Sequence, residues 1–245
     1  GMFHSNLLHI AAQNPNQDVF QFVLSKIHIV IDILSPQNCL LETDRSNNTP
    51  LITAIECGQI NIAKAIIEQC KNSNTLQNVI AIKNDYNDNI LHIAARRLGE
   101  NFIQIIVEEL KTYPETLKKL LLDKNVDGDA PFFLSTEYEA FDDLKFFVDT
   151  FEDLNIVKVA FLSTNVNNEN ILHLAARKKN DCLKFLLEHL DKYPEVFKDL
   201  FKTKDEYEVN PLFEAASMNS KKNMQLLIKN IHKLKIFETA ISVKN

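Results

Sequence analysis

The chain has 245 residues, of which 45% are hydrophobic, and it carries a formal net charge of −6 at pH 7. This hydrophobic fraction is enough for a folded core, whereas the negative charge argues against a general polyanion binder, because such proteins usually present a basic face. The four cysteines form no CxxC pair and are too sparse for a disulfide framework, which favours a reducing, cytoplasmic compartment. We expect no cleaved signal peptide and no membrane span, because the most apolar stretch, residues 27–34, is short and contains His28 and Asp32.

A seven-residue pattern occurs six times along the chain. It reads NLLHIAA from residue 6, TPLITAI from 49, NILHIAA from 89, APFFLST from 130, NILHLAA from 170 and NPLFEAA from 210, at spacings of 43, 40, 41, 40 and 40 residues. A regular period of this length indicates a repeat architecture, in which each repeat buries its apolar face against the next. We therefore expect a single array over residues 1–245, with repeats at about 2–43, 44–83, 84–124, 125–164, 165–204 and 205–230.

Each repeat should begin with a tight turn followed by two helices. The position two residues before the pattern is Asn or Gly in four of the five turns from the second repeat onward, and both residues accept a left-handed turn conformation. The pattern then opens on a helix-capping residue in five of six repeats, Ala130 being the exception, and continues with Pro in three of them, which suits the first helical position. A second apolar run with helical periodicity follows in every repeat.

The linkers between repeats predict a third, short helix. Apolar residues recur there at i, i+3 and i+4, as in Phe197, Leu200 and Phe201, and Pro194 stands near the first turn of that segment. After the last repeat, residues 231–245 again show a helical apolar spacing. They predict a C-terminal capping helix, which would cover the end of the array.

The repeated pattern resembles the ankyrin repeat, whose motif D-x-x-G-x-T-P-L-H-x-A-A-x-x-G is matched most closely from Thr49 to Glu68. Six copies in phase extend the resemblance to about 230 residues. The resemblance implies an all-α fold, an ankyrin-like α-solenoid of stacked helix-turn-helix repeats. Here the extra short helix in the linkers lengthens the family's usual period of about 33 residues to about 40.

Three histidines, His9, His92 and His173, share one position of the pattern. By resemblance this histidine holds the neighbouring turn through a hydrogen bond, and Ile52 or Phe133 at the same position of other repeats indicates packing rather than chemistry. Layers of helices lie about 10 Å apart, so histidines two repeats apart should be too distant to share a zinc ion. We expect no catalytic, cofactor-binding or metal-binding residue.

Two other groupings admit a catalytic interpretation. Cys182 and His189, seven residues apart, resemble a nucleophile and base, but Cys182 falls in an apolar position and is better explained as a core residue. Acidic pairs such as Asp142 and Asp143 are better explained as a solvated edge. The fourth repeat, with Ala130 at the capping position, departs from the pattern, and either drift or a functional site explains such a departure.

The resemblance places partner binding on the concave face of the array, at the turn tips and the exposed end of the first helix of each repeat. Arginine and tyrosine are common among interface hot spots. The alternative, left open, is that the basic residues only solubilise the surface and favour the C-terminal end of a helix. The predicted partner-binding residues are Arg45, Asp85, Tyr86, Asp88, Asp127, Asp129, Asn167, Glu169 and Tyr207 at the tips, and Glu56, Arg96, Arg97, Glu137, Tyr138, Arg177, Lys178 and Met218 at the helix ends.

The sequence therefore predicts a cytoplasmic, non-enzymatic scaffold that binds another protein and needs neither cofactor nor small-molecule substrate. A composition typical of AT-rich coding adds the hypothesis of an effector that an intracellular bacterium translocates into a host cell. Two alternatives stay open. One is a targeting or regulatory module of a larger enzyme, or an unrecognised enzyme; the other, nucleic-acid binding, predicts strongly salt-dependent retention and is disfavoured by the net charge.

Overall fold

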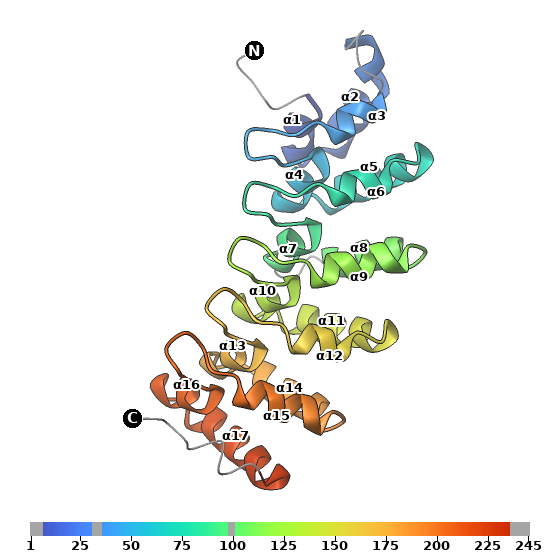
Figure 1. Cartoon of the computed structure of the whole chain (residues 1–245). Coiled ribbons are helices and arrows are strands. Elements are labelled where there is room, and N and C mark those ends of the chain that lie inside the picture. The colour runs from blue at the N-terminus through green and yellow to red at the C-terminus, as the bar shows by residue number, and fades with distance from the viewer. Residues whose placement is uncertain (1–6, 31–35, 98–100, 236–245) are drawn as a thin grey trace. The chain divides into compact units, whose positions relative to one another are not determined.

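The computed structural model describes residues 7–30, 36–97 and 101–235, and every regular element in these ranges is an α-helix (Figure 1). The chain divides into two compact parts, an N-terminal half of residues 1–126 and a C-terminal half of residues 127–245. The prediction of one array over the whole chain therefore stays a prediction. None of the described helices is both long and apolar enough to cross a membrane.

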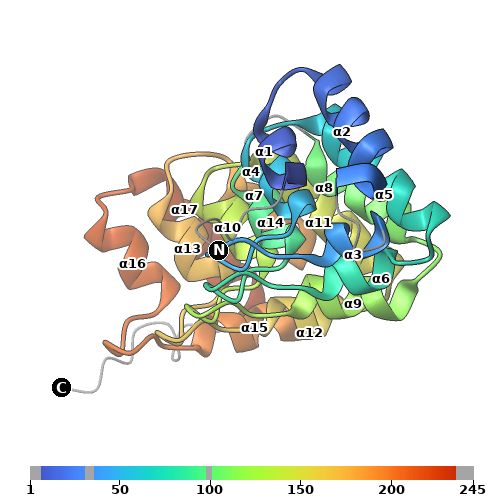
Figure 2. The same cartoon turned by 90° about the horizontal axis from the view of Figure 1, so that it is seen from above.

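In the N-terminal half, three repeats each contribute three helices, and helices in equivalent positions pack on one another, α1 on α4, α4 on α7, α2 on α5 and α3 on α6. Seen from above, α1, α4 and α7 lie together, apart from α3, α6 and α9 (Figure 2). The helices are α1 (Leu7–Gln13), α2 (Gln17–Val30), α3 (Pro36–Leu41), α4 (Pro50–Glu56), α5 (Ile60–Asn72), α6 (Leu76–Ala81), α7 (Ile90–Ala95), α8 (Phe102–Leu110) and α9 (Pro114–Leu122).

The C-terminal half repeats this arrangement, with α10 packed on α13, α13 on α16, α14 on α17 and α12 on α15. The predicted linker helix is confirmed in all five linkers, as α3, α6, α9, α12 and α15. The helices of this half are α10 (Pro131–Glu137), α11 (Phe141–Asp153), α12 (Val157–Phe161), α13 (Ile171–Arg177), α14 (Cys182–Leu190), α15 (Pro194–Lys202), α16 (Pro211–Ser217) and α17 (Lys221–Leu234).

The linker helices complete the core of each repeat. In α15, Phe197, Leu200 and Phe201 are buried as predicted, and the rings of Phe197 and Phe201 stack at 5.9 Å between centroids. A fully buried side chain of this size contributes about 1.5–3 kcal/mol to stability. The linker helix therefore adds to the core in addition to lengthening the connection.

The capping residues start the first helices as expected. The Asn170 side chain accepts hydrogen bonds from the backbone N–H groups of Leu172 and His173, and its Nδ2 donates to the Leu200 carbonyl at 2.7 Å. Thr49, Asn89 and Asn210 also accept from backbone N–H groups, whereas the Ala130 side chain accepts none. Asn89 and Asn170 thus each cap a first helix, α7 or α13, and each also donates a hydrogen bond from Nδ2 to a carbonyl of a linker helix, α9 or α15.

The turns adopt the predicted left-handed backbone. Asn47, Asn87, Gly128, Asn168 and Glu208 have φ between 58° and 75°. Asn87 also donates from Nδ2 to the carbonyl of Lys124 at 2.7 Å, and Asn168 donates likewise to that of Lys204, so these asparagines tie one repeat to the next.

Two parts of the sequence prediction fall at the ends of the described ranges. Asn6, the predicted cap of α1, lies outside them. Ile231 and Leu234 belong to the end of α17 rather than to a new helix, and Lys235 ends α17 with φ of 54°. The rest of the predicted capping helix, residues 236–245, also lies outside the described residues.

Candidate partner-binding surface

Two histidines of the repeated pattern, His9 and His173, hold neighbouring turns. His9 Nε2 lies 2.8 Å from the carbonyl oxygen of Asn48, and His173 Nε2 lies 3.1 Å from that of Val209, with both histidines fully buried. A carbonyl only accepts, so His173 donates from Nε2, while its Nδ1 accepts from the Asn170 N–H. Burial lowers the pKa of His173, which favours this neutral form. Within the described ranges, no three His, Cys, Asp or Glu residues gather to hold a metal ion.

Cys182 and His189 are both buried and do not present a reactive pair. Burial raises the pKa of the Cys182 thiol to about 11, so the thiol stays protonated at neutral pH. His189 packs against the rings of Phe161, Phe185 and Tyr193, and burial lowers its pKa. This geometry supports the interpretation of Cys182 as a core residue.

At the turn tips of the N-terminal half, exposure separates the predicted residues into two groups. Arg45, Asp85 and Tyr86 are exposed, and Tyr86 has 64% of its surface accessible. Asp88, in contrast, is fully buried. Its carboxylate lies 2.5 Å from Nη1 of Arg96 and accepts a hydrogen bond from Asn125 Nδ2 at 3.0 Å. Direct contact between Asp88 and a partner, as the sequence pattern predicted, therefore does not fit this structure.

Asp88 instead holds the arginine at the end of α7. The Arg96 side chain is 29% exposed and its Nη2 also reaches Asp88, at 3.3 Å, so one face of the guanidinium is fixed while part of the side chain meets solvent. Arg97 is half-buried, and Glu56, at the end of α4, is exposed and accepts a hydrogen bond from Asn48 Nδ2 at 3.3 Å.

The C-terminal half contains the same arrangement. Glu169 is 8% exposed, and its carboxylate lies 2.6 Å from Nη2 of Arg177, whose Nε lies 3.4 Å from Glu214. Asn165 Nδ2 donates to Glu169 at 2.9 Å. Glu169, like Asp88, is thus a buried residue that positions an arginine, and its predicted direct contact is revised for the same reason.

Most of the other predicted residues of this half are exposed, whereas Asp129 and Lys178 are half-buried. Tyr138, Tyr207 and Met218 are 46%, 76% and 45% exposed. Only 17% of the Lys178 side chain is exposed, and its Nζ lies 2.9 Å from the carboxylate of Glu137.

A groove of about 320 Å³ separates the turn tips from the ends of the first helices in the fourth and fifth repeats. We call it the acidic groove, because four of its lining residues are carboxylates. Burial raises the pKa of Asp129 to about 6, and the negative charges of Asp127, Glu169 and Glu137 add to this rise while a hydrogen bond from Asn165 opposes it. The groove is lined by Asp127, Asp129, Glu137, Asn165, Val166, Asn167, Glu169, Leu174 and Arg177.

Asn165, Leu174 and Glu214 were not among the predicted binding residues. Glu214 reaches Arg177 because the sixth repeat packs on the fifth, and Asn165 and Leu174 line the groove that the fourth and fifth repeats form together. No pattern within a single repeat marks them as site residues, although the recurring Asn or Asp at the position of Asn165 was visible as a turn signal.

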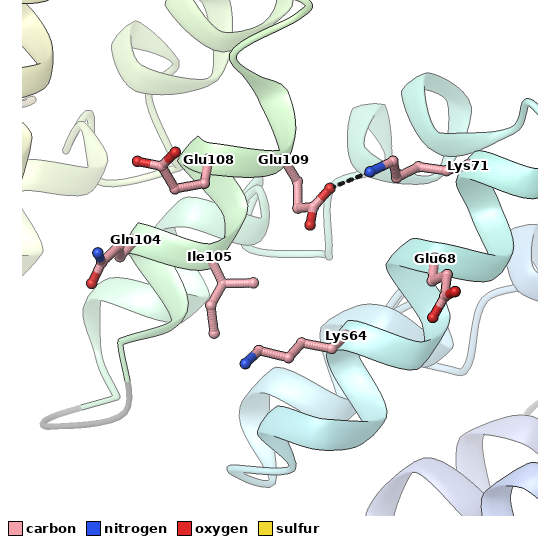
Figure 3. Close-up of a pocket in the computed structure, with 7 residues that line it drawn as sticks. All are labelled: Lys64, Glu68, Lys71, Gln104, Ile105, Glu108 and Glu109. Atoms are coloured by element: carbon pink, nitrogen blue, oxygen red, sulfur yellow. Dashed lines mark hydrogen bonds and ion pairs between the residues drawn. The ribbon is translucent and has the colours of Figure 1, made fainter.

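A larger groove, of about 480 Å³, lies between α5 and α8 (Figure 3). Figure 3 shows Lys71 and Glu109 meeting across it, and their charged atoms are 2.6 Å apart. This groove contains none of the predicted residues and carries both signs of charge, so its size alone does not make it the better candidate. Its lining residues are Lys64, Glu68, Lys71, Gln104, Ile105, Glu108 and Glu109.

Comparison with known proteins identifies the repeated pattern. The sequence model of ankyrin repeats (3 copies) matches residues 3–78 and 144–237, which together are more than half of the chain. A search of the curated proteins gave no match.

Solved structures share the fold at low sequence identity. A chain in the structure of the Bd0816 predatory endopeptidase from Bdellovibrio bacteriovorus in complex with immunity protein Bd3460 is 16% identical, with a TM-score of 0.59 over 92% of this chain and 98% of that one. The ankyrin repeat protein EF0377 is 19% identical, with a TM-score of 0.62 over 92% and 98%. An ankyrin repeat domain from Acinetobacter baumannii AYE is 14% identical, with a TM-score of 0.58 over 91% and 96%. The match to the family model, together with the capped first helices and the histidines that hold neighbouring turns, shows that the chain belongs to the ankyrin repeat family.

Proposed function

We propose that the protein is a non-enzymatic scaffold that binds another protein through its turn tips and the ends of its first helices. The observation that carries this proposal is the pair of buried carboxylates, Asp88 and Glu169, each of which holds an arginine partly exposed at the surface. Such fixed side chains lose little conformational freedom on binding, and preorganisation of this kind increases affinity.

Exposed aromatic residues on the same surface also support the proposal that it binds another protein. Tyr86 and Tyr207 occupy turn tips and Tyr138 follows the first helix of the fourth repeat, where each presents a large ring with a polar end. Tyrosine is among the residues most often found at the energetic centre of interfaces. Ankyrin repeats are in general protein-binding modules, which agrees with this arrangement.

Cytoplasmic location and translocation into a host cell remain proposals that rest on cysteine usage and composition. The scaffold proposal is independent of them, because it concerns only the surface chemistry of the repeats.

Affinity capture from native or host lysate tests the scaffold proposal. We expect a variant with Tyr86→Ala, Tyr138→Ala and Tyr207→Ala to lose the proteins that the wild-type chain retains. The matched control replaces three exposed apolar residues outside the tips, Phe22→Ala, Val159→Ala and Ile228→Ala, and should retain them. Far-UV circular dichroism checks that both variants fold. Equal retention by both variants would exclude the tip surface as the binding site.

A further inference from the structure

The last helix pair of the C-terminal half exposes apolar side chains at positions that are buried one repeat earlier. Phe213 of α16 is 39% exposed, whereas His173, at the same position of α13, is fully buried. Ile228 of α17 is 40% exposed, whereas Leu187, at the same position of α14, is 3% exposed. The sixth repeat packs on the fifth through α16 on α13 and α17 on α14, and no described helix follows α17 (Figure 1). Phe213 and Ile228 therefore occupy packing positions, yet both meet solvent.

Contacts with the fifth repeat fix the orientation of α17. Asn223 is buried near the start of the helix, and its Nδ2 donates hydrogen bonds to the carbonyls of Ala176 and Lys178, at 2.9 and 2.7 Å. Leu227 and Ile231, four and eight residues further along, are buried on the same side. The buried side of α17 is thus set, and with it the side that meets solvent.

Residues 221–235 contain five lysines and no carboxylate, although the whole chain has a net charge of −6. The other second helices, α2, α5, α8, α11 and α14, each contain at least one Asp or Glu. Asp181 and Asp191 of the fifth repeat pair with two of the lysines, Lys222 and Lys233, at 2.7 Å each. The other three are exposed and form no ion pair with a described residue: Lys221, Lys229 and Lys235. This part of a negatively charged chain is therefore locally positive.

The three unpaired lysines and the two exposed apolar residues lie on neighbouring helices, and we call them together the end face. Lys221, Ile228 and Lys235 are spaced by seven residues, which places them along one side of α17, and Lys229 adjoins them. The helix that carries Phe213, α16, packs against α17. A bilayer with anionic headgroups offers a plane of negative charge above an apolar layer, which fits both kinds of side chain. A second copy of the chain would bring its own lysines against these, so charge disfavours pairing of two end faces.

We propose that the end face binds the surface of an anionic lipid bilayer. Phe213 and Ile228 enter the boundary between headgroups and acyl chains, while the ammonium groups of the three lysines meet the lipid phosphates and carboxylates. Such peripheral binding requires no membrane-spanning helix. The proposal goes beyond the scaffold function and involves none of the turn-tip tyrosines.

Cosedimentation of the full chain with lipid vesicles tests the proposal. Vesicles of an equimolar mixture of phosphatidylcholine and phosphatidylserine are compared with vesicles of phosphatidylcholine alone. One variant replaces the lysines of the end face, Lys221→Gln, Lys229→Gln and Lys235→Gln. Its matched control replaces three exposed lysines of other second helices, Lys26→Gln, Lys64→Gln and Lys145→Gln. Both variants change the net charge from −6 to −9, so general repulsion from the vesicles is the same in the two.

A second pair of variants tests the apolar part of the end face. Phe213→Ala with Ile228→Ala removes its two apolar side chains. The control, Phe22→Ala with Val159→Ala, removes two exposed apolar side chains from other helices. Far-UV circular dichroism checks that all four variants fold.

We expect the wild-type chain to bind the vesicles with phosphatidylserine and not those of phosphatidylcholine alone. Each lysine close to an anionic membrane strengthens binding by about fivefold, so the end-face lysine variant should bind at least about tenfold more weakly than its control. Phe213→Ala with Ile228→Ala should bind about fivefold or more weakly than its control, because less apolar surface enters the bilayer.

The proposal is overturned if the wild-type chain does not prefer the anionic vesicles, or if either end-face variant binds them as well as its control. Binding of polyglutamate or of a single-stranded oligonucleotide as tightly as the vesicles would assign the end face to an acidic polymer instead. A dimer in analytical ultracentrifugation that Phe213→Ala with Ile228→Ala dissociates would assign it to a second copy of the chain. The tyrosine variant keeps every residue of the end face, so its loss of captured proteins tests the scaffold function alone.

Discussion

Replacing Asp129 by asparagine should stabilise the protein at neutral pH. The pKa of Asp129 rises from its usual 3.8 to about 6 in the folded chain, chiefly through burial. Taken in full, this rise corresponds to about 3 kcal/mol of unfavourable free energy for the ionised form. Solvent reaches part of the carboxyl and screens it, so we expect about half of this value, about 1.5 kcal/mol. Asparagine keeps an oxygen that can accept the hydrogen bond from Asn165 and carries no charge.

Because the pKa of Asp129 is raised in the folded chain, the stabilisation expected from Asp129→Asn depends on pH. Below pH 3.8 the carboxyl is protonated in the folded and the unfolded chain, and its titration contributes nothing to the difference between them. As the pH rises, the unfolded chain releases the proton first, so the wild-type protein loses stability until the pH passes about 6. The Asp129→Asn variant has no such loss. Its advantage should therefore be greatest above neutrality and nearly absent near pH 4.

Urea unfolding followed by circular dichroism measures this difference at the two pH values. The control Asp85→Asn neutralises an exposed tip carboxylate and should change the free energy of unfolding by less than about 0.5 kcal/mol. The reasoning is refuted if Asp129→Asn is less stable than the wild-type chain above neutrality, or if its advantage is the same near pH 4.

Three further outcomes are expected from the geometry. Asn170→Ala removes a helix cap and the hydrogen bond to the Leu200 carbonyl, so the free energy of unfolding measured in urea should fall by about 2 kcal/mol. Asn167→Ala, at the exposed tip, should change this free energy little. Equal effects of the two substitutions would contradict the capping role. Gly128→Ala should destabilise the chain by about 1–2 kcal/mol, because Gly128 has φ of 75° and a Cβ there would lie 2.6 Å from the Val166 nitrogen. An unchanged midpoint of urea unfolding would show that this turn adapts to the methyl group. Iodoacetamide should label exposed Cys57 well before buried Cys70 and Cys182, because pKa values of about 11 keep these two thiols protonated. Mass spectrometry measures the order of labelling. Early labelling of Cys182 would contradict its place in the core.

The sequence by itself determined the elements of the fold. Repeats of about 40 residues, caps such as Asn170, left-handed turns such as Asn87 and the apolar spacing of Phe197, Leu200 and Phe201 were all readable in advance. These features depend on hydrogen bonds and helical periodicity within a few residues, so they leave a local pattern. The family resemblance supplied the stacking of the repeats and the structural role of His173.

Only the tertiary structure decided which side chains of the predicted surface are available to a partner. Asp88 and Glu169 occupy turn tips in the sequence pattern, yet both are buried, and each pairs with an arginine at the end of the first helix, Arg96 or Arg177. Other contacts join residues about one repeat apart, such as Lys178 with Glu137, and form only when repeats pack. The acidic groove and the raised pKa of Asp129 follow from this packing, since burial and local potential depend on distances in space rather than on spacing along the chain.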